Sequence, residues 1–495
     1  MRSQITRPKV LLMSAVLKVR AMSHLPSAAR FSVILLALAG FFAPQAGAQT
    51  RPNVLIIIAD DLGVGEVGVY GPTVCSPTVC SSPGPTPVLD QLAANGVRFK
   101  RAWSNPACSP TRATLYTGRY SMRTGVGTAI LDPNPTGAGE LADTEFTLPA
   151  ALTAIGYKSA LIGKWHLGTS VYGDFSPLDV GGFNFHAGVL TGVLTSYNRW
   201  NRTVTDDQLG TTITNMDRTY ATTQNVDDAV TWIGTQTGPW MLTLAFNAPH
   251  EPYHLPPRRL LSQATRQALQ AAGVNNNSDC RLNNQRLCYQ AAIEAMDTEI
   301  GRLFVQGGIS LSDTFIIFLG DNGTPGDVTV PPFDPNRAKA TVNEGGIRVP
   351  LIIAGPSVVS PGRVVNDPVN TTDIFPTISS VTGAANPNGT DWVSLFPYLD
   401  NTAVLPLRAY VYSEFFDAGT DPHNDPEGDG TAAIFDGMFK VIESGGVLTE
   451  CYDLSSDEYE TINLWDPLNP RSECQTLYDT MGADLHNCQS PHLCP

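Results

Sequence analysis

Short apolar runs that end at turn residues recur along the chain and predict buried strands. They are rich in β-branched and aliphatic residues, as expected of a parallel sheet that is covered on both faces. Five runs have this character: Asn53–Ala59, Ser159–Ile162, Met241–Phe246, Phe315–Leu319 and Leu351–Ala354. Segments with helical spacing of apolar residues alternate with them: Thr86–Asn95, Leu148–Ile155, Asn225–Thr235 and Tyr289–Phe304. The alternation predicts an α/β fold with a large, doubly wound, mostly parallel sheet flanked by helices.

Ionisable and amide side chains follow four of these predicted strands where each strand ends. They are Asp60-Asp61, the pair Lys164 and His166, His250, and Asp321-Asn322. Ligands of doubly wound sheets bind beyond the carboxyl ends of the strands. We therefore expect these side chains to lie together at one edge of the sheet and to form the functional site.

The first 48 residues have the pattern of a secretory signal peptide. They hold six Lys and Arg and no Asp or Glu, then an apolar run from Phe31 to Ala43, and end in the small residues Ala46-Gly47-Ala48. The apolar run is too short to span a bilayer, and no later stretch is apolar enough for a transmembrane helix. The long basic stretch leaves Met22 open as the true start. We predict a periplasmic or secreted protein with no membrane span.

Net charge restricts the partners of the mature chain. The sequence has 31 Lys and Arg and 46 Asp and Glu, so removal of six positive charges leaves 25 against 46, or −21. This balance argues against nucleic acid and anionic membranes as partners. It also means that an anionic substrate needs local basic residues.

The C-terminal part changes character after about residue 405. Tyr410–Phe416 and Thr431–Glu443 predict antiparallel strands, and an acidic tail with four cysteines follows. The predicted division is a signal peptide at 1–48, a catalytic domain at 49–404, and a small α+β subdomain with an antiparallel sheet at 405–495. The polar segments Ser196–Thr223 and Pro256–Leu287 are expected to be rich in loops and to shape the rim of the site rather than to form domains.

Nine cysteines are an odd number for an exported protein. Two sets are near neighbours, Cys75 with Cys80 and Cys280 with Cys288, and local disulfides between them suit an oxidising compartment. The last four, whose pairing the sequence leaves open, are Cys451, Cys474, Cys488 and Cys494. Cys108 is the residue left over.

The strand-end carboxylates predict a metal site. Adjacent carboxylates after a buried strand, such as Asp60 and Asp61, repel each other and need a cation, although a loop-capping pair is the simpler alternative. Asp321 and Asn322 repeat the arrangement after another strand. An all-oxygen set of this kind suits Ca²⁺, or Mg²⁺, rather than zinc.

Basic residues near these carboxylates predict an anion site. Lys164 and His166, at spacing two after a strand end, lie on the same side of an extended segment. Arg112 lies one turn into a helix that is expected to begin near Pro110, and it points back toward Cys108. For Lys164 and His166 the alternative is a glycine-bounded turn with a packed Trp165 and a structural histidine.

Two motifs match the patterns of other enzyme classes. Gly63-Val-Gly65-Glu-Val-Gly68 follows a strand as a dinucleotide fingerprint does, but Asp60 and Asp61 would face the pyrophosphate and no amphipathic helix follows. His250-Glu-Pro-Tyr-His254 matches the zinc-protease pattern, which requires a helix that Pro252 disfavours. We reject the first and keep zinc metalloprotease as a lesser alternative.

Taken in order, the motifs resemble those of the formylglycine-dependent (type I) sulfatases of the alkaline-phosphatase superfamily, including the arylsulfatases. The similar segments cover residues 51 to about 380, and the Cys-Tyr-Asp-Leu stretch that begins at Cys451 resembles the family's C-terminal subdomain. The central one is Cys108-Ser-Pro-Thr-Arg112, followed by Thr-Gly-Arg119. Cys75-Ser-Pro-Thr-Val79 is a near copy that lacks the arginine, and we expect it to escape oxidation. The other segments are Arg51–Leu62, Thr86–Phe99, Gly163–Gly168, Ala248–His250, Gly320–Gly323 and Lys339–Pro350.

The resemblance implies a reaction. A formylglycine-generating enzyme would oxidise Cys108 to 3-oxoalanine (formylglycine), whose hydrate attacks the sulfur of a sulfate-ester substrate with help from Asp321. Asp60, Asp61, Asp321 and Asn322 would hold Ca²⁺ together with residue 108. His250 would protonate the leaving group, and His166 would take the proton of the second hydroxyl. Lys164, Lys339 and Arg112 would neutralise the sulfuryl oxygens.

Two other functions remain open at this stage. A phosphonate monoester or phosphodiester hydrolase could use the same site. If Cys108 is never oxidised, the chain would be a non-catalytic Ca²⁺-dependent binding protein. The sequence does not reveal the alcohol part of the substrate.

Overall fold

The structure is a computed structural model, and it describes residues 51–71, 83–134, 137–168, 177–207, 211–389, 391–417 and 430–482. The predicted signal peptide, the Cys75–Cys80 pair, Cys488 and Cys494 lie outside these ranges. Within the described ranges, no helix is both long and apolar enough to cross a lipid bilayer.

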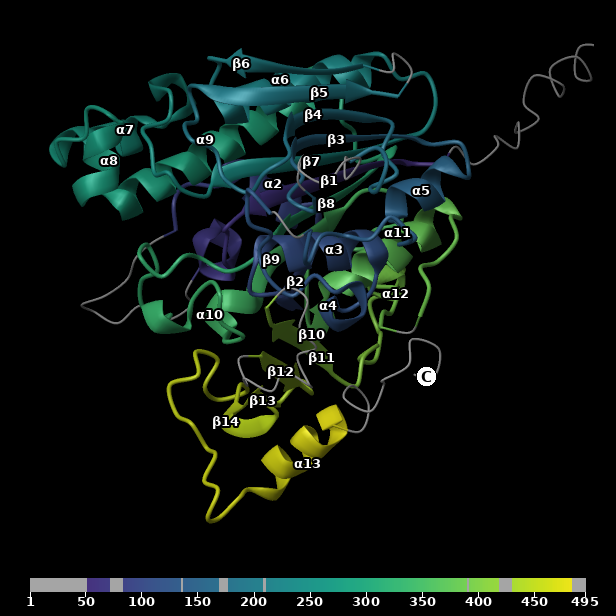
Figure 1. The fold of residues 1–495 in the computed structure, drawn as a ribbon, viewed down its shortest axis with the longest axis vertical. Coiled ribbons are helices and arrows are strands. Elements are labelled where there is room, and N and C mark those ends of the chain that lie inside the picture. Colours follow the sequence, from purple (N-terminus) through teal and green to yellow (C-terminus); the bar gives the residue numbers. More distant parts are fainter. Residues whose placement is uncertain are drawn as a thin grey trace, which may run out of the picture. The chain divides into compact units, whose positions relative to one another are not determined.

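A ten-stranded sheet forms the centre of the fold, in the order β10-β2-β9-β8-β1-β7-β3-β4-β5-β6 (Figure 1). Five neighbouring pairs are parallel and four are antiparallel, so the predicted mostly parallel α/β sheet is confirmed. The strands are β1 Asn53–Asp60, β2 Gly96–Trp103, β3 Lys158–Lys164, β4 Phe185–Val189, β5 Trp200–Asp206, β6 Thr211–Asp217, β7 Trp240–Pro249, β8 Thr314–Gly320, β9 Arg348–Ala354 and β10 Arg363–Asn370.

Helices cover both faces of this sheet, as the alternating pattern predicts. One face packs against α2, α6 and α9, and the other packs against α3, α5, α11 and α12. The helices are α2 Pro87–Ala94, α3 Cys108–Thr117, α4 Ser121–Thr124, α5 Leu148–Thr153, α6 Ala221–Gly234, α7 Gln263–Ala271, α8 Asn277–Asn283, α9 Gln285–Gln306, α10 Glu344–Ile347, α11 Ile374–Thr382, α12 Phe396–Asp400 and α13 Ser472–Met481.

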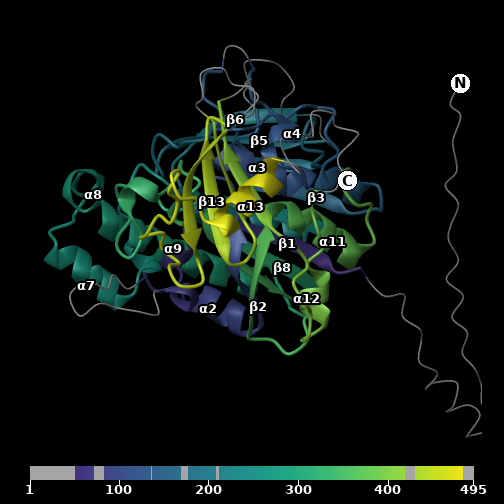
Figure 2. The same ribbon diagram turned by 90° about the horizontal axis from the view of Figure 1, so that it is seen from below.

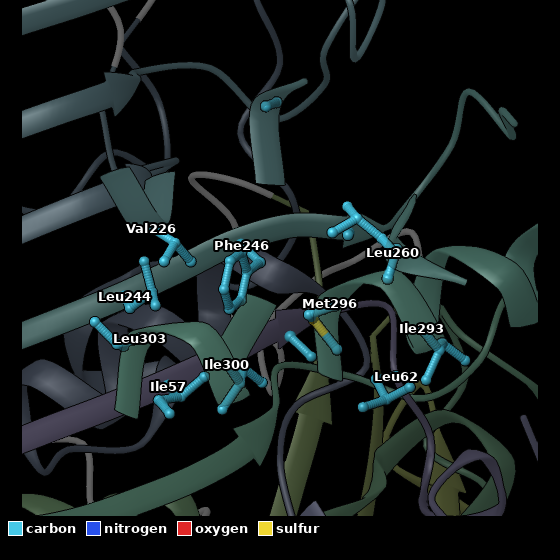
Figure 3. Close-up of a cluster of buried hydrophobic side chains, with 14 of the residues drawn as sticks. Ile57, Leu62, Val226, Leu244, Phe246, Leu260, Ile293, Met296, Ile300 and Leu303 are labelled. Carbon is cyan, nitrogen blue, oxygen red and sulfur yellow. The ribbon is translucent and has the colours of Figure 1, made fainter. Parts of the chain in front are cut away.

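Strand β1 shows why its sequence is a continuous apolar run. Alternate residues of a strand point to opposite faces. Leu55 and Ile57 therefore pack with α9, while Val54 and Ile56 pack on the other face. Figure 3 shows Ile57 facing Ile300 and Leu303 of α9, the helix predicted over Tyr289–Phe304. Burial on both faces leaves no position for a polar residue until the strand ends.

Several details differ from the sequence-based expectation. Strand β9, predicted as Leu351–Ala354 of a parallel sheet, runs antiparallel to both of its neighbours. Of the two segments expected to be rich in loops, Ser196–Thr223 carries the β5–β6 hairpin, and Pro256–Leu287 carries α7 and α8. Their polar composition reflects exposed edge strands and surface helices rather than loops. Helix α3 begins at Cys108 and not near Pro110, because Pro is tolerated in the first turn.

The C-terminal part forms a second, antiparallel sheet in the order β11-β12-β13-β14, as predicted. Figure 2 shows it with α13 in yellow, next to β2 of the large sheet. Phe435 stacks on Trp103 of β2, with ring centroids 5.7 Å apart. The strands are β11 Val411–Phe415, β12 Thr431–Phe435, β13 Phe439–Ser444 and β14 Val447–Asp453. The predicted boundary at residues 404–405 lies between α12 and β11 and stays a prediction.

Two disulfides lie in the described part of the chain. Cys280 and Cys288 are bonded, so the predicted local pair is confirmed. Cys451 pairs with Cys474, which answers part of the question that the sequence leaves open at the C-terminus. Among the described cysteines only Cys108 is free, and it is buried.

Candidate active site

Four adjacent parallel strands bring the predicted site residues to one edge of the sheet. Strands β8, β1, β7 and β3 are consecutive neighbours and run in the same direction. Their carboxyl ends therefore meet, as expected for a doubly wound sheet. At or directly after these ends lie, in the strand order β8, β1, β7 and β3, Asp321-Asn322, Asp60-Asp61, His250, and the pair Lys164 and His166.

Cys108 reaches the same edge from a fifth strand. It is the first residue of α3, which follows β2 after a short loop, and its side chain is buried. The Thr111 hydroxyl accepts a hydrogen bond from the Asn105 amide at 2.9 Å, and the Ser109 hydroxyl accepts one from the Ile130 amide at 3.1 Å. These contacts fix the turn that presents residue 108.

The acidic residues surround the Cys108 thiol. One ligand atom each of Asp60, Asp61 and Cys108 lies within 4.8 Å of the others. Asp321 binds the Asp61 amide at 2.9 Å, and the Asn322 amide group donates to Asp61 Oδ1 at 2.8 Å. The four sequence-predicted oxygen ligands therefore belong to one buried cluster. Asp61 itself has a left-handed backbone, with φ +66°, which turns its side chain toward the cluster.

Two oxygens of this cluster have no hydrogen-bond donor. Asp60 Oδ1 and Asn322 Oδ1 are both buried and unpartnered. A buried acceptor without a donor is costly unless a ligand satisfies it. Carboxylate and amide oxygens are the ligands that Ca²⁺ prefers. The donor set therefore fits an oxygen-liganded divalent cation.

Two lysines balance the carboxylates. Lys164 Nζ lies 2.7 Å from Asp60 Oδ2, and Lys339 Nζ lies 2.6 Å from Asp61 Oδ1. Burial by itself lowers a lysine pKa, but the anionic groups around each lysine together outweigh it. Asp60 leads the groups that raise the pKa of Lys164, and Asp61 leads those that raise the pKa of Lys339. Both ammonium groups are thus charged at neutral pH.

The carboxyl groups of Asp60 and Asp61 differ in pKa. Burial raises the pKa of Asp60 to about 6 against the opposing charge of Lys164. Burial also acts to raise the pKa of Asp61, but His250 and Lys339 outweigh it and hold that pKa below its usual range. Asp61 is therefore the more strongly ionised of the two.

The two histidines present different nitrogen atoms. His250 Nδ1 lies 2.9 Å from the Glu251 carbonyl, so that nitrogen carries a proton, and Nε2 lies 3.5 Å from Asp61 Oδ2. His166 Nε2 lies 2.9 Å from the Ile130 carbonyl, which leaves the buried Nδ1 as an unpartnered acceptor. Burial and then Lys164 lower the pKa of His166 well below its ordinary value. His166 is therefore a neutral base at neutral pH.

Arg112 links two of the strand ends. Its Nη2 lies 2.7 Å from Asp321 Oδ2, and its Nη1 donates to the Lys164 carbonyl at 2.8 Å. Nε is buried and has no partner. Arg112 thus connects Asp321 with the end of β3. The structure brings all ten predicted side chains together at one edge of the sheet.

Neither competing motif has the backbone that its chemistry requires. Residues 250–254 contain no helix, and His254 Nε2 bonds the Tyr220 hydroxyl at 2.9 Å instead of turning to a metal beside His250. Gly63 is extended, Gly65 and Gly68 lie in two short 3₁₀ turns, Val64–Glu66 and Gly68–Tyr70, and no long helix starts there. The zinc-protease and dinucleotide patterns are coincidences of sequence.

Tyr289 is a site residue that sequence reasoning missed. Its hydroxyl donates to the Asp61 carbonyl at 2.7 Å, from the first turns of α9. The sequence shows it only as an apolar helix position, because its partner lies 228 residues away. Through this hydrogen bond Tyr289 supports the left-handed backbone of Asp61.

A mostly parallel, doubly wound sheet with this acidic and basic cluster at its carboxyl edge defines a hydrolase of the alkaline-phosphatase superfamily. The Sulfatase family model matches residues 52–384, and the model of the N-sulphoglucosamine sulphohydrolase C-terminal region matches residues 337–489. The chain therefore belongs to the sulfatase family. It is a sulfuric ester hydrolase.

The chain is similar to individual proteins in sequence and in fold. The chain is 28% identical to bovine (Bos taurus) arylsulfatase A over 478 residues, which cover 85% of each protein. The PsFucS1 sulfatase from Pseudoalteromonas sp. has a similar fold, with a TM-score of 0.66 and 21% identity over 92% of this chain and 94% of that one. The phosphonate monoester hydrolase of Agrobacterium radiobacter also shares the fold, with a TM-score of 0.63 and 22% identity over 90% and 96% of the chains.

Proposed function

We propose that this sulfatase is exported by its N-terminal 48 residues and hydrolyses sulfate esters with a formylglycine made from Cys108 and a bound Ca²⁺. The observation that carries the proposal is the environment of Cys108. A buried thiol beside two lysines and a cluster of carboxylates suits a modified residue better than a cysteine nucleophile. Burial raises the pKa of the Cys108 thiol, so the reactive thiolate is disfavoured.

Oxidation of Cys108 would supply an aldehyde whose hydrate is an oxygen nucleophile, and a bound Ca²⁺ would supply a Lewis acid for a sulfate oxygen. Asp60, Asp61, Asp321 and Asn322 would hold the ion together with residue 108. Two of these residues carry the unpartnered oxygens Asp60 Oδ1 and Asn322 Oδ1. Mg²⁺ is the alternative ion. The two ions differ in the number of oxygen ligands that they bind, and this number would distinguish them.

The charges of the site suit an anionic substrate. Three carboxylates, Asp60, Asp61 and Asp321, face three permanent cations, Arg112, Lys164 and Lys339. A divalent cation would therefore leave two net positive charges in a protein whose overall charge is negative. Fixed charges of this kind stabilise the sulfuryl oxygens in the transition state without reorganisation.

The histidines have complementary proton-transfer roles in this proposal. His250 Nε2 faces the site and would protonate the departing alcohol oxygen, because an unprotonated alkoxide leaves poorly. His166 is neutral, and its Nδ1 would accept the proton of the second hydroxyl as the aldehyde re-forms. One water is consumed in each cycle, and the alcohol and sulfate are released.

Tyr289→Phe is expected to weaken Ca²⁺ binding about tenfold, as loss of a residue that supports a metal ligand does. The reason is the lost hydroxyl contact with the Asp61 carbonyl at 2.7 Å. Calorimetric titration of Ca²⁺ measures the affinity directly. Tyr157→Phe is the matched control, because its hydroxyl also donates to a main-chain carbonyl at 2.7 Å, that of Pro52. Equal Ca²⁺ affinity in both variants would contradict the role of Tyr289.

A panel of esters tests the proposed reaction. The substrates share one leaving group and differ in the acid part: a sulfate ester, a phosphate diester and a phosphonate monoester. The purified enzyme should have its highest kcat/KM with the sulfate ester. The phosphonate reaction is the second candidate, since a phosphonate monoester hydrolase shares this fold. A higher kcat/KM for the phosphonate would favour that second candidate.

A further inference from the structure

The segment from Arg337 to Glu344 carries Lys339 to the active edge of the sheet. It reaches this edge because β9 is antiparallel, so that the chain before Arg348 lies beside the carboxyl ends of β8 and β2. No carboxyl end of a strand carries Lys339. Its position depends on what holds the two ends of this segment.

The C-terminal subdomain holds the first end. Arg337 donates a short hydrogen bond from Nη1 to the main-chain carbonyl of Glu460, in the loop that follows β14. The same guanidinium lies 3.3 Å from Glu450 Oε2 and 5.4 Å above the ring of Tyr452, both in β14. Two contacts thus hold Arg337 on β14, and the third holds it on the loop that follows this strand.

Glu460 also holds the second end. Its Oε2 accepts a hydrogen bond from the Glu344 amide at 2.8 Å, and its Oε1 lies 2.7 Å from Lys440 Nζ of β13. Glu344 Oε1 in turn accepts from Lys440 Nζ at 3.2 Å and from the Trp103 indole at 3.0 Å. Glu344, Lys440 and Glu460 are all at least 98% buried.

The segment between these ends is packed closely against the residues that follow β8 and β2. The Lys339 amide donates to the Thr324 carbonyl at 3.0 Å, and the Ala340 amide donates to the Pro106 carbonyl at 2.9 Å, two residues before Cys108. A Cβ on Gly345 would lie 2.3 Å from the Arg337 carbonyl oxygen, so α10 touches the main chain beside Lys339. A shift of Glu344 would move Lys339.

Glu460 is itself held rigidly. Its backbone is left-handed, with φ +58°, and it lies in the loop closed by the Cys451–Cys474 disulfide. A buried ion cluster is weak evidence for stability, because desolvation offsets the attraction between the charges. One side chain that binds both ends of the Lys339 segment is better explained by the geometry that it imposes.

We propose that Glu460, with Lys440, is a positioning residue of the active site, through which the C-terminal subdomain fixes the 337–344 segment and sets the place of the Lys339 ammonium group. The proposal rests on the role proposed above for Lys339 in sulfate hydrolysis. It gives the small C-terminal sheet a part in turnover although it contributes none of the ten residues of the site.

The test is a double-mutant cycle on the full-length, matured enzyme with an aryl sulfate. Glu460→Ala should lower kcat by about 10- to 100-fold, since a displaced catalytic group costs rates of this order. In the Lys339→Met background the same change should cost less than about twofold, because residues that act through one another are not additive. Glu460→Gln keeps the oxygen that accepts from Glu344 and should retain kcat within about threefold.

Glu299→Ala is the matched control for general loss of stability. Glu299 is a buried carboxylate with an ion pair to Arg302 and a hydroxyl contact to Thr223, both outside the 337–344 segment. It should lower the melting temperature and leave kcat within about twofold. Should Glu460→Ala not fold, Glu460→Asp takes its place in the cycle, because it keeps the charge but shortens the reach to Glu344.

The outcomes separate this inference from the proposed function. An unchanged kcat in Glu460→Ala, or an equal loss in both backgrounds, overturns the positioning role while Lys339 keeps its own. Full activity of the Lys339→Met single variant would show that Lys339 has no role in the reaction. It would also overturn the positioning role of Glu460.

Discussion

Cys108→Ala is expected to lower kcat by roughly 10⁴-fold or more, the scale on which loss of a nucleophile acts. The alanine side chain offers no thiol to oxidise and no hydroxyl to attack sulfur. Neighbouring groups cannot replace it, because Lys164, Lys339 and His250 carry charge and protons but form no bond to the substrate in the proposed reaction. Steady-state turnover of an aryl sulfate measures the loss.

Folding and metal binding should survive this substitution. Removal of the buried end of this short side chain leaves a small cavity that costs about 1 kcal/mol of unfolding free energy. Asp60, Asp61, Asp321 and Asn322 remain in place, so Ca²⁺ binding by calorimetry should weaken only slightly. Ample turnover in Cys108→Ala would exclude residue 108 as the nucleophile.

Lys339→Met is expected to lower kcat/KM by about 10²-fold or more, as removal of one preorganised charge does. Lys339 Nζ lies 2.6 Å from Asp61 and would face the sulfuryl oxygens beside the ion. Methionine keeps most of the volume of the side chain and removes only its charge. Initial rates over a range of substrate concentrations separate kcat from KM.

Lys158→Met is the control for this variant. Lys158 is exposed and begins β3, while Lys164 ends the same strand at the active site. Loss of this charge should leave kcat/KM within about twofold. If Lys339→Met behaves like Lys158→Met, the charge at position 339 plays no part in the transition state.

The positions at strand ends were predictable from the sequence because one physical rule covers them. Asp60, Lys164, His250 and Asp321 each follow a continuous apolar run, and such runs pair as neighbouring parallel strands. Gly163 adds a local signal. A Cβ there would lie 1.8 Å from the Ala245 carbonyl oxygen of β7, so only glycine fits.

Strand direction was less predictable. The apolar run Leu351–Ala354 is compatible with parallel and with antiparallel pairing, because both of its faces are buried. Its antiparallel direction decides that Lys339 approaches the site from the amino end of a strand. The β5–β6 hairpin was missed because its exposed edge carries a polar run of threonines.

The supporting residues could not be found from local patterns. Tyr289 appears in the sequence as one more apolar position of α9, and Glu460 as one acid in an acidic tail. Their partners, Asp61 and Glu344, lie 228 and 116 residues away. Only the packing of α9 and of the C-terminal sheet against the large sheet reveals these contacts.

Mass spectrometry of the peptide that contains residue 108, from active enzyme, tests the central claim most directly. The account predicts an aldehyde at residue 108 with loss of the thiol. The peptide that contains Cys75, which has the same Cys-Ser-Pro-Thr order without the arginine, is the internal control and should not be oxidised to an aldehyde. An intact cysteine at position 108 in fully active protein would contradict the account.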